Sequence, residues 1–171
     1  MVLWHDLDLE TIQYAASKTG TTKFSLEGNV PLRFQIPRGR VLYNGLSGFK
    51  SITIEMPPDF VTWWREKLEP ALAGGLTPFN SNMKEYSLRL KVDKSTQVFD
   101  ARRQIQFPEL VEGLFGSAVV TCIAEITGTY FFQDNYGLTC RIHQVVVAEP
   151  EFEAEPEEPT ESVKGFAFVG V

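Results

Sequence analysis

The sequence predicts a mainly β protein: an OB-fold-like Greek-key barrel with one helix between its third and fourth strands, followed by an acidic C-terminal tail. Up to residue 148, most of the chain consists of short runs in which apolar and polar side chains alternate. This two-residue period is typical of half-buried strands. One stretch has instead the four-residue spacing of an amphipathic helix. The last residues are dominated by Glu and Pro.

Three strand-like runs precede the helix. The clearest is 30–36 (VPLRFQI), and 40–44 and 49–56 follow it after the breaks PRG and GLSG. Upstream, residues 8–18 (DLETIQYAASK) are compatible with a short helix, and the KTGTTK sequence that follows is typical of a loop.

The helix is predicted to begin at Pro57-Pro58-Asp59, because proline and an acidic residue suit a first helical turn. Gly74 and Gly75 end it, and Pro70 within it predicts a kink or an early end. Large apolar residues recur at four-residue steps and form one stripe: Phe60, Trp64, Leu68 and Leu72.

The second half returns to strand patterns. A polar loop is expected at 74–84, a hairpin turn at DNYG (134–137), a basic loop at 101–108 and a single helical turn at 108–114; strands are expected at 85–92, 97–100, 117–133 (broken at Gly128) and 138–147. A helix between the third and fourth strands of a small closed barrel is the layout of the OB-fold. A generic β-barrel or sandwich with one packed helix fits the same pattern.

Charge divides the chain at residue 148. Residues 149–171 hold seven Glu and one Lys, which accounts for the whole net charge of −6 and leaves residues 1–148 neutral. A Glu/Pro-rich segment cannot bury enough apolar surface to fold alone. We therefore expect a barrel domain at 1–148 and a tail at 149–171 that ends in the apolar sequence FAFVGV.

Composition indicates a cytoplasmic protein. No run of 18 apolar residues is present, and the N-terminus MVLWHDLDLE lacks the pattern of a secretion signal, so we expect no membrane contact. Two cysteines, Cys122 and Cys140, are too few for a disulfide scaffold and are expected to be buried thiols.

Catalytic and metal-binding patterns are absent from the sequence. Cys140 and His143 are three residues apart on an expected strand, which places them on opposite faces, and no close Cys/His pair suggests zinc. A hydrolase would have to use His143, which sits in an apolar strand. The carboxylates of the tail are solvated and unsuited to acid–base catalysis. We expect neither an enzyme nor a cofactor.

Basic and aromatic residues are instead mixed along the expected strands. They occur around Arg33 to Tyr43, from Arg89 to Arg103, and in the hairpin from Tyr130 to Arg141. Single-stranded nucleic acid is bound by this combination, because cations follow the phosphates and aromatic faces stack on bases. Many of these aromatics must also build the core.

The apolar tip FAFVGV admits three interpretations. It can dock on partner proteins while the glutamates compete with a polyanion for the basic groove. It can add as a strand to a sheet edge, here or on a neighbour, which would give a homodimer. It can also be the end of a plain disordered tail.

The chain resembles the single-stranded DNA-binding proteins of DNA viruses and phages, in plan those of short-tailed phages and their relatives in large DNA viruses. The resemblance rests on LRLKVDKSTQVFDARRQ (88–104), on the hairpin at 117–147 and on the acidic tail, about half of the chain. It implies an OB-fold core, binding without sequence preference, and a tail that recruits replication or recombination proteins. The apolar tip departs from the family pattern, in which acidic residues continue up to a final Phe.

The resemblance and the residue pattern together place DNA binding on eight residues and partner binding on two. The DNA-binding residues are Arg89, Lys91, Phe99, Arg102, Arg103, Tyr130, Tyr136 and Arg141; the partner-binding residues are Phe166 and Phe168. The leading hypothesis is single-stranded DNA binding in viral DNA replication or recombination, in the cytoplasm or nucleoid of a host cell. The alternative is a structural or assembly protein that uses its tip for strand addition.

Overall fold

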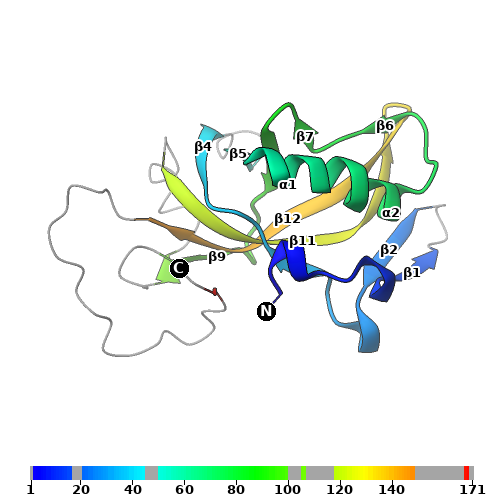
Figure 1. The fold of residues 1–171 in the computed structure, drawn as a ribbon, viewed down its shortest axis with the longest axis horizontal. Coiled ribbons are helices and arrows are strands. Elements are labelled where there is room, and N and C mark those ends of the chain that lie inside the picture. Colours follow the sequence, from blue (N-terminus) through cyan, green and yellow to red (C-terminus); the bar gives the residue numbers. More distant parts are fainter. Residues whose placement is uncertain are drawn as a thin grey trace, which may run out of the picture.

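A computed structural model describes residues 2–16, 21–44, 50–99, 105–106, 118–148 and 168–169, most of them in β-strands (Figure 1). The strands are β1 (Gln13–Ala16), β2 (Thr22–Ser25), β3 (Arg33–Gln35), β4 (Gly39–Asn44), β5 (Ser51–Glu55), β6 (Phe79–Asn80), β7 (Met83–Lys84), β8 (Ser87–Lys91), β9 (Gln97–Phe99), β10 (Ile105–Gln106), β11 (Val119–Phe132) and β12 (Asn135–Val147). The helical segments are α1 (Pro58–Trp63), the π-helical η4 (Trp64–Leu68), α2 (Glu69–Ala73) and the 3₁₀ turns η1 (Trp4–Asp6), η2 (Leu9–Thr11) and η3 (Glu27–Asn29).

The sheet closes on itself as a barrel. β11 and β12 form a long antiparallel hairpin that crosses the middle of the molecule in Figure 1. β4 pairs with β11, β5 with β4 and β8 with β5, all antiparallel, and β8 pairs in parallel with β12, which completes the circuit. β2 and β1 extend the sheet beyond β11, and β9 and β10 extend it beyond β12. This mainly β arrangement is consistent with the OB-like sheet expected from the sequence.

The helix follows β5 in the sequence and precedes β8. β3 and β4 both pair with β11 and together fill one position of the circuit. Pro37 separates them, because it has no N–H to donate to a ladder. The helix therefore connects β5 and β8, two neighbouring strands of the circuit.

The predicted apolar stripe of the helix is confirmed. Phe60, Trp64, Leu68 and Leu72 are all buried against the barrel. The ring of Phe34, from β3, packs edge-on against Trp63 with centroids 5.6 Å apart, and Trp4 meets Phe60 in the same way at 5.2 Å. The aromatic contacts therefore fix both the helix and the N-terminal segment on the barrel.

Pro70 does not end the helix. The chain stays helical from Pro58 to Ala73, and the π-helical turn η4 comes immediately before the segment that contains Pro70. In α-geometry the proline ring would clash with the carbonyl of residue 66, and a wider π turn relieves such a clash. The helix ends at Gly74, whose φ of 57° favours glycine, as the sequence predicts. No helix in the described ranges is long and apolar enough to cross a membrane.

Some local predictions were wrong, and one lies outside the described residues. Of the segment 8–18, which was expected to be helical, the described residues 8–16 form the 3₁₀ turn η2 and strand β1, which pairs with β2; the Tyr14 hydroxyl donates to the carbonyl of Ala71 at 2.9 Å. Tertiary contacts thus override local helix propensity. The central residues of the hairpin turn are Gln133 and Asp134, two residues earlier than Asn135 and Tyr136, the central residues of the expected turn. Both have positive φ, as in a type I′ turn. The helical turn expected at 108–114 falls outside the described ranges.

Gly39 offers a direct test of the packing between β4 and β5. A Cβ at this position would collide with the carbonyl oxygen of Glu55 and lie 2.7 Å from Ile54 Cγ2. We expect Gly39→Ala to lower the free energy of unfolding by about 1–3 kcal/mol, because the backbones must move apart. Urea unfolding measures this value. Gly75→Ala is the matched control, because nothing lies within 4 Å of a Cβ there; equal losses in both variants would contradict the packing argument.

Candidate functional site

A cleft of about 640 Å³ lies between the outer face of β5 and β8 and the tip of the β11–β12 hairpin. Among the residues that the structure describes, its lining contains three basic side chains, two aromatic ones and not one carboxylate. The lining residues are Ser51, Thr53, Asn80, Ser81, Asn82, Lys84, Ser87, Arg89, Lys91, Tyr130, Phe132, Gln133, Leu138, Thr139 and Cys140. In a chain whose charge is otherwise balanced up to residue 148, this composition produces a local positive potential.

Strand alternation places Arg89 and Lys91 in the cleft. Leu88 and Leu90 point into the core, so their neighbours on β8 point outward. The register with β5 sets Ser51 opposite Lys91. Arg89 donates from Nε to the Ser51 hydroxyl at 3.1 Å, which orients its guanidinium along the cleft wall.

The segment 80–84 forms the rim of the cleft and is tied down at several points. The Ser81 hydroxyl donates to Glu69 of α2 and accepts from the backbone N–H of Met83 at 3.0 Å. Burial raises the pKa of Glu69, and the bond from Ser81 opposes this rise. Lys84 donates from Nζ to Asn80 Oδ1 at 2.9 Å. These contacts hold Lys84 at the cleft by linking the rim to the helix.

The aromatic wall comes from the end of β11. Tyr130 lies across its cross-strand partner Gly137, where a Cβ would collide with the ring. Phe132, two residues on, is 66% exposed. Phe131 points to the other side of the strand and contacts Tyr136, with centroids 4.8 Å apart. The two faces of the hairpin tip therefore each carry aromatic rings, and the rings of one face line the cleft.

The structure brings together three of the residues expected to bind DNA: Arg89, Lys91 and Tyr130 line the cleft. Tyr136 lies on the opposite face of the hairpin. Phe99 is fully buried, and its ring packs edge-on against Phe168. Arg102, Arg103 and Phe166 lie outside the described residues.

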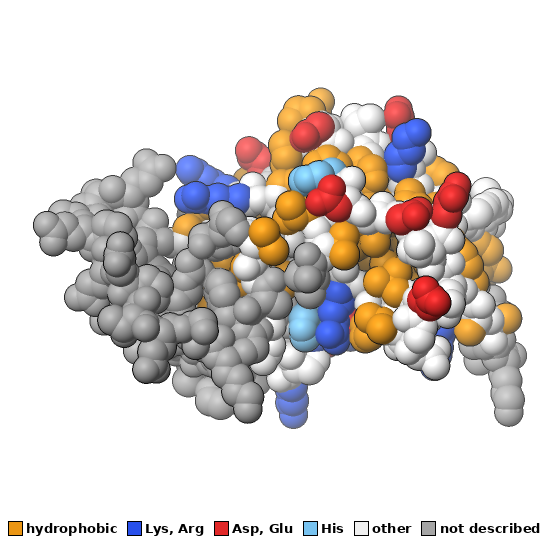
Figure 2. Space-filling view, turned by 60° about the horizontal axis from the view of Figure 1, so that its bottom comes forward, with side chains coloured by type: hydrophobic (Ala, Val, Ile, Leu, Met, Phe, Trp, Pro, Cys, Tyr) orange, Lys and Arg blue, Asp and Glu red, His pale blue; other side chains and the backbone are white. Residues whose placement is uncertain are grey.

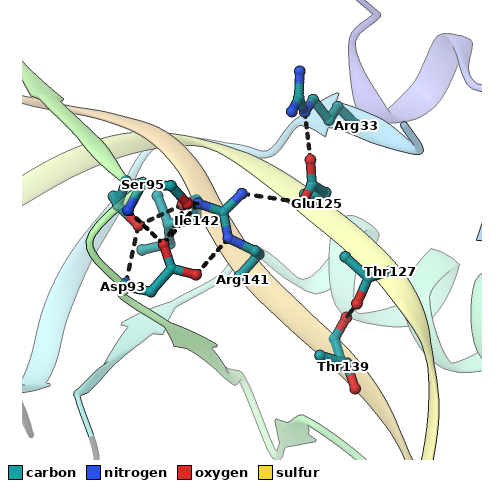
Figure 3. A network of polar contacts seen from close by, with 9 residues as sticks. Arg33, Asp93, Ser95, Glu125, Thr127, Thr139, Arg141 and Ile142 are labelled. Atoms are coloured by element: carbon teal, nitrogen blue, oxygen red, sulfur yellow. Dashed lines mark hydrogen bonds and ion pairs between the residues drawn. The ribbon is translucent and has the colours of Figure 1, made fainter. Parts of the chain in front are cut away.

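Arg141 belongs to a polar network and not to the cleft (Figure 3). Its guanidinium donates to both oxygens of Asp93, at 2.7 and 2.9 Å, and to Glu125 at 3.0 Å. Glu125 also accepts from Arg33 Nε at 2.6 Å. The network therefore joins β3, β11, β12 and the turn after β8.

The network shifts the pKa of its members toward their charged forms. The hydrogen bond from Arg141 lowers the pKa of Asp93, against the effect of burial. Burial acts to raise the pKa of Glu125, but the bonds from Arg33 and Arg141 together lower it. The bond to Asp93 raises the pKa of Arg141. A guanidinium held by two carboxylates is already neutralised, so we leave Arg141 out of the candidate interface.

Sequence reasoning missed Lys84 and Phe132 as site residues. Lys84 stands in a segment expected to be a polar loop, whereas it forms the short strand β7 beside β8. Phe132 precedes a hairpin turn, and an aromatic at the tip of a hairpin that extends past the barrel has no core to enter. Its position next to the turn was the available signal.

A second cleft adjoins the first and shares Lys84 and Ser87 with it. It contains Arg38 and Arg40 but also two acidic residues, Glu55 and Glu85. The face shown in Figure 2 likewise carries acidic side chains scattered among hydrophobic and neutral ones. The first cleft differs from both in having cations without a carboxylate.

Groups suited to catalysis do not gather in the described ranges. Burial, aided by the charge of Arg33, lowers the pKa of His143. The thiols of Cys122 and Cys140 are buried and free, as expected, and burial raises the pKa of both. Among the residues that the structure describes, no group of three His, Cys, Asp or Glu side chains could hold a metal ion.

Comparison with solved structures identifies the fold. The chain is similar to the single-stranded DNA-binding protein of bacteriophage Enc34 (TM-score 0.54, 12% identity, 85% of this chain and 96% of that one). It is also similar to that protein in complex with single-stranded DNA (0.54, 13%, 89% and 99%) and to its C-terminal truncation (0.52, 14%, 88% and 98%). No protein-family model and no curated protein matches the chain. At 12–14% sequence identity, this similarity concerns the fold alone.

The Arg141 network predicts how stability depends on pH. Because the pKa values of Asp93 and Glu125 are lowered on folding, their contribution is complete above the ordinary carboxyl pKa of about 4 and is lost as the pH falls below it. We expect Arg141→Met to cost roughly 3 kcal/mol at neutral pH, because it leaves Glu125 with one partner fewer in a buried setting.

Urea unfolding between about pH 7 and about pH 3 measures both effects. The variant should lose less stability on acidification than the unmodified protein, because without Arg141 the pKa values of Asp93 and Glu125 are lowered less on folding. Lys67→Met, on the exposed face of the helix, is the control. Parallel pH profiles for the unmodified protein and Arg141→Met would contradict the assignment.

Proposed function

We propose that this protein has an OB-fold and binds single-stranded DNA without sequence preference in the cleft between β8 and the hairpin tip. The observation that carries the proposal is the joint presence of Lys84, Arg89 and Lys91 with exposed aromatic rings and no carboxylate. Cations neutralise successive phosphates, and rings stack on bases of any identity. The fold shared with a phage protein solved in complex with single-stranded DNA supports the same conclusion.

The cleft is organised before any ligand arrives. Ser51 orients Arg89, Asn80 holds Lys84, and the absence of a side chain at Gly137 leaves room for the ring of Tyr130. Ordering these groups in advance lowers the entropic cost of binding. Basic and aromatic residues lie on separate walls, so a strand in the cleft can direct phosphates to β8 and bases to the hairpin. The protein would act by occupying the strand, without a covalent step.

The biological setting is proposed from the family resemblance. A protein of this kind protects exposed strands during viral DNA replication or recombination and passes them to enzymes. The acidic tail at 149–171 would recruit those partners and compete with DNA for the basic cleft, since it carries the entire net charge. The protein would act in the cytoplasm or nucleoid of a host cell. A homodimer is compatible with this role.

The alternative, an assembly protein that adds its tip to a sheet edge, has less support from the described contacts. Within the part of the chain that the structure describes, Val169 bonds to the side chain of Gln35 and not to the backbone of an edge strand. Size-exclusion chromatography with and without residues 165–171 separates the two functions. A tail-dependent oligomer without DNA affinity would favour the assembly role.

Lys91→Ala tests the electrostatic part of the proposal. Removing one phosphate contact should weaken binding to labelled oligo-dT about three- to tenfold and reduce the slope of log K against log salt by about 0.7. Fluorescence anisotropy over a range of salt concentrations measures both. Lys67→Ala, an exposed lysine on the helix that does not line the cleft, should change neither. Absence of binding at low salt, or binding indifferent to salt, would refute the proposed function.

Phe132→Ala tests base stacking. The loss of one stacking face should cost about 1–3 kcal/mol of binding free energy while the salt slope stays unchanged. Phe131→Ala is a matched control, because Phe131 is similarly exposed (55%) but points away from the cleft. The same anisotropy titration is used. Equal losses in the two variants would place the DNA elsewhere on the hairpin.

A further inference from the structure

The C-terminal tip of the chain is seated on the barrel. The backbone N–H of Val169 donates to Gln35 Oε1 at 2.9 Å, and Gln35 Nε2 donates to the carbonyl of Val169 at 2.9 Å. The side-chain amide of Gln35 thus bonds both polar groups of one residue, as a neighbouring strand would. Phe168 adds a ring contact with Phe99, at 6.2 Å and 84°. In Figure 1 the short red segment at residues 168–169 lies near β9, in agreement with this contact.

The receiving residues are held by barrel strands. Gln35 is only 6% exposed and ends β3, where its backbone N–H donates to the carbonyl of Val2 and its partner on β11 is Ile123. Phe99 ends β9, which runs parallel to β12. A buried amide without partners costs about 1–3 kcal/mol. In the described ranges, both hydrogen bonds of this amide are made with Val169.

We propose that Gln35 and Phe99 form a docking site for the chain's own C-terminal tip. The site recognises an extended backbone through the Gln35 amide and an aromatic side chain through the Phe99 ring. The tip is the occupant that the contacts show, and its covalent attachment to β12 gives it an effective concentration that a separate molecule rarely reaches. The docking contacts lie outside the cleft between β8 and the hairpin, whose lining includes neither Gln35 and Phe99 nor Phe168 and Val169.

The docking site gives the tail a second state. While Phe168 and Val169 are seated, the aromatic group best suited to a protein partner is occupied. After release, the chain beyond Ala148 is attached at one end only and Phe168 is exposed. The docking site therefore competes with partner proteins for the tip. Competition for the cleft is separate and involves the DNA and the acidic part of the tail. This inference goes beyond the proposed function and does not depend on it.

Amide hydrogen exchange in the full-length chain, measured by NMR, tests the proposal without DNA. The Val169 amide should exchange on the order of tenfold slower than an unstructured amide, and Gln35→Leu should abolish this protection. Phe168→Ser, which leaves the barrel unaltered, should have the same effect and should also shift the side-chain amide resonances of Gln35. Gln13→Leu, on the exposed strand β1, is the control and should preserve the protection.

Any of the following results would overturn the assignment. One is exchange of Val169 at the unstructured rate in the unmodified protein. Another is protection that survives Gln35→Leu, or Gln35 side-chain resonances that are unmoved by Phe168→Ser. The last is protection that rises with protein concentration together with a doubled mass in light scattering, because the tip would then dock on a second copy. Unchanged protection over a concentration series supports docking within one chain.

Discussion

The fold depends on the guanidinium of Arg141 and its two carboxylates. The barrel closes between β8 and β12, and that contact has a single registered pair, Lys91 with Arg141. A ladder this short contributes little cohesion by itself. The bonds from Arg141 to Asp93, just beyond β8, and to Glu125 on β11 supply the missing attachment. The side chains of Arg141 and Glu125 are only 11% and 10% exposed, so salt screens this ion pair less than a pair on the surface.

The same closure positions the cleft. Lys91 is the register partner of Arg141, so the network that holds one end of β8 also fixes the strand that carries Arg89 and Lys91 outward. Two basic residues side by side in one sheet thus have different roles. Arg141 is neutralised by acids and maintains the barrel, while Lys91 borders a cleft whose lining contains no acid.

This difference also marks the limit of prediction from sequence. Alternation along β8 and the four-residue stripe from Phe60 to Leu72 are local patterns, and both were read correctly because strand and helix periods are local. The carboxylates that neutralise Arg141 stand 48 and 16 residues away in the chain, and no local pattern reveals them. The same applies to Phe99: its sequence neighbours do not reveal that it is buried and that its ring contacts Phe168, which is 69 residues away in the chain.

The aromatics of the hairpin show how far local rules extend. Strand parity assigns Phe131 and Phe132 to opposite faces, but it does not say which face borders the cleft, since that depends on β5, β8 and the rim at 80–84. Likewise, the turn residues DNYG predict a hairpin but not which residues of its two strands pair. The positive φ values at Gln133 and Asp134 set the turn two residues earlier, and this places Tyr130 opposite Gly137.

The two proposed binding surfaces rely on different physical forces. The cleft attracts a polyanion through cations, so its affinity falls as salt is added. The docking site uses a neutral amide and two rings, Phe99 and Phe168, and its contacts respond only weakly to ionic strength. The acidic residues of the tail stand in sequence between these two kinds of contact. A change in salt concentration can therefore change DNA binding in the cleft while the tip stays docked. Conversely, a protein partner with a higher affinity for Phe168 can release the tip without displacing DNA.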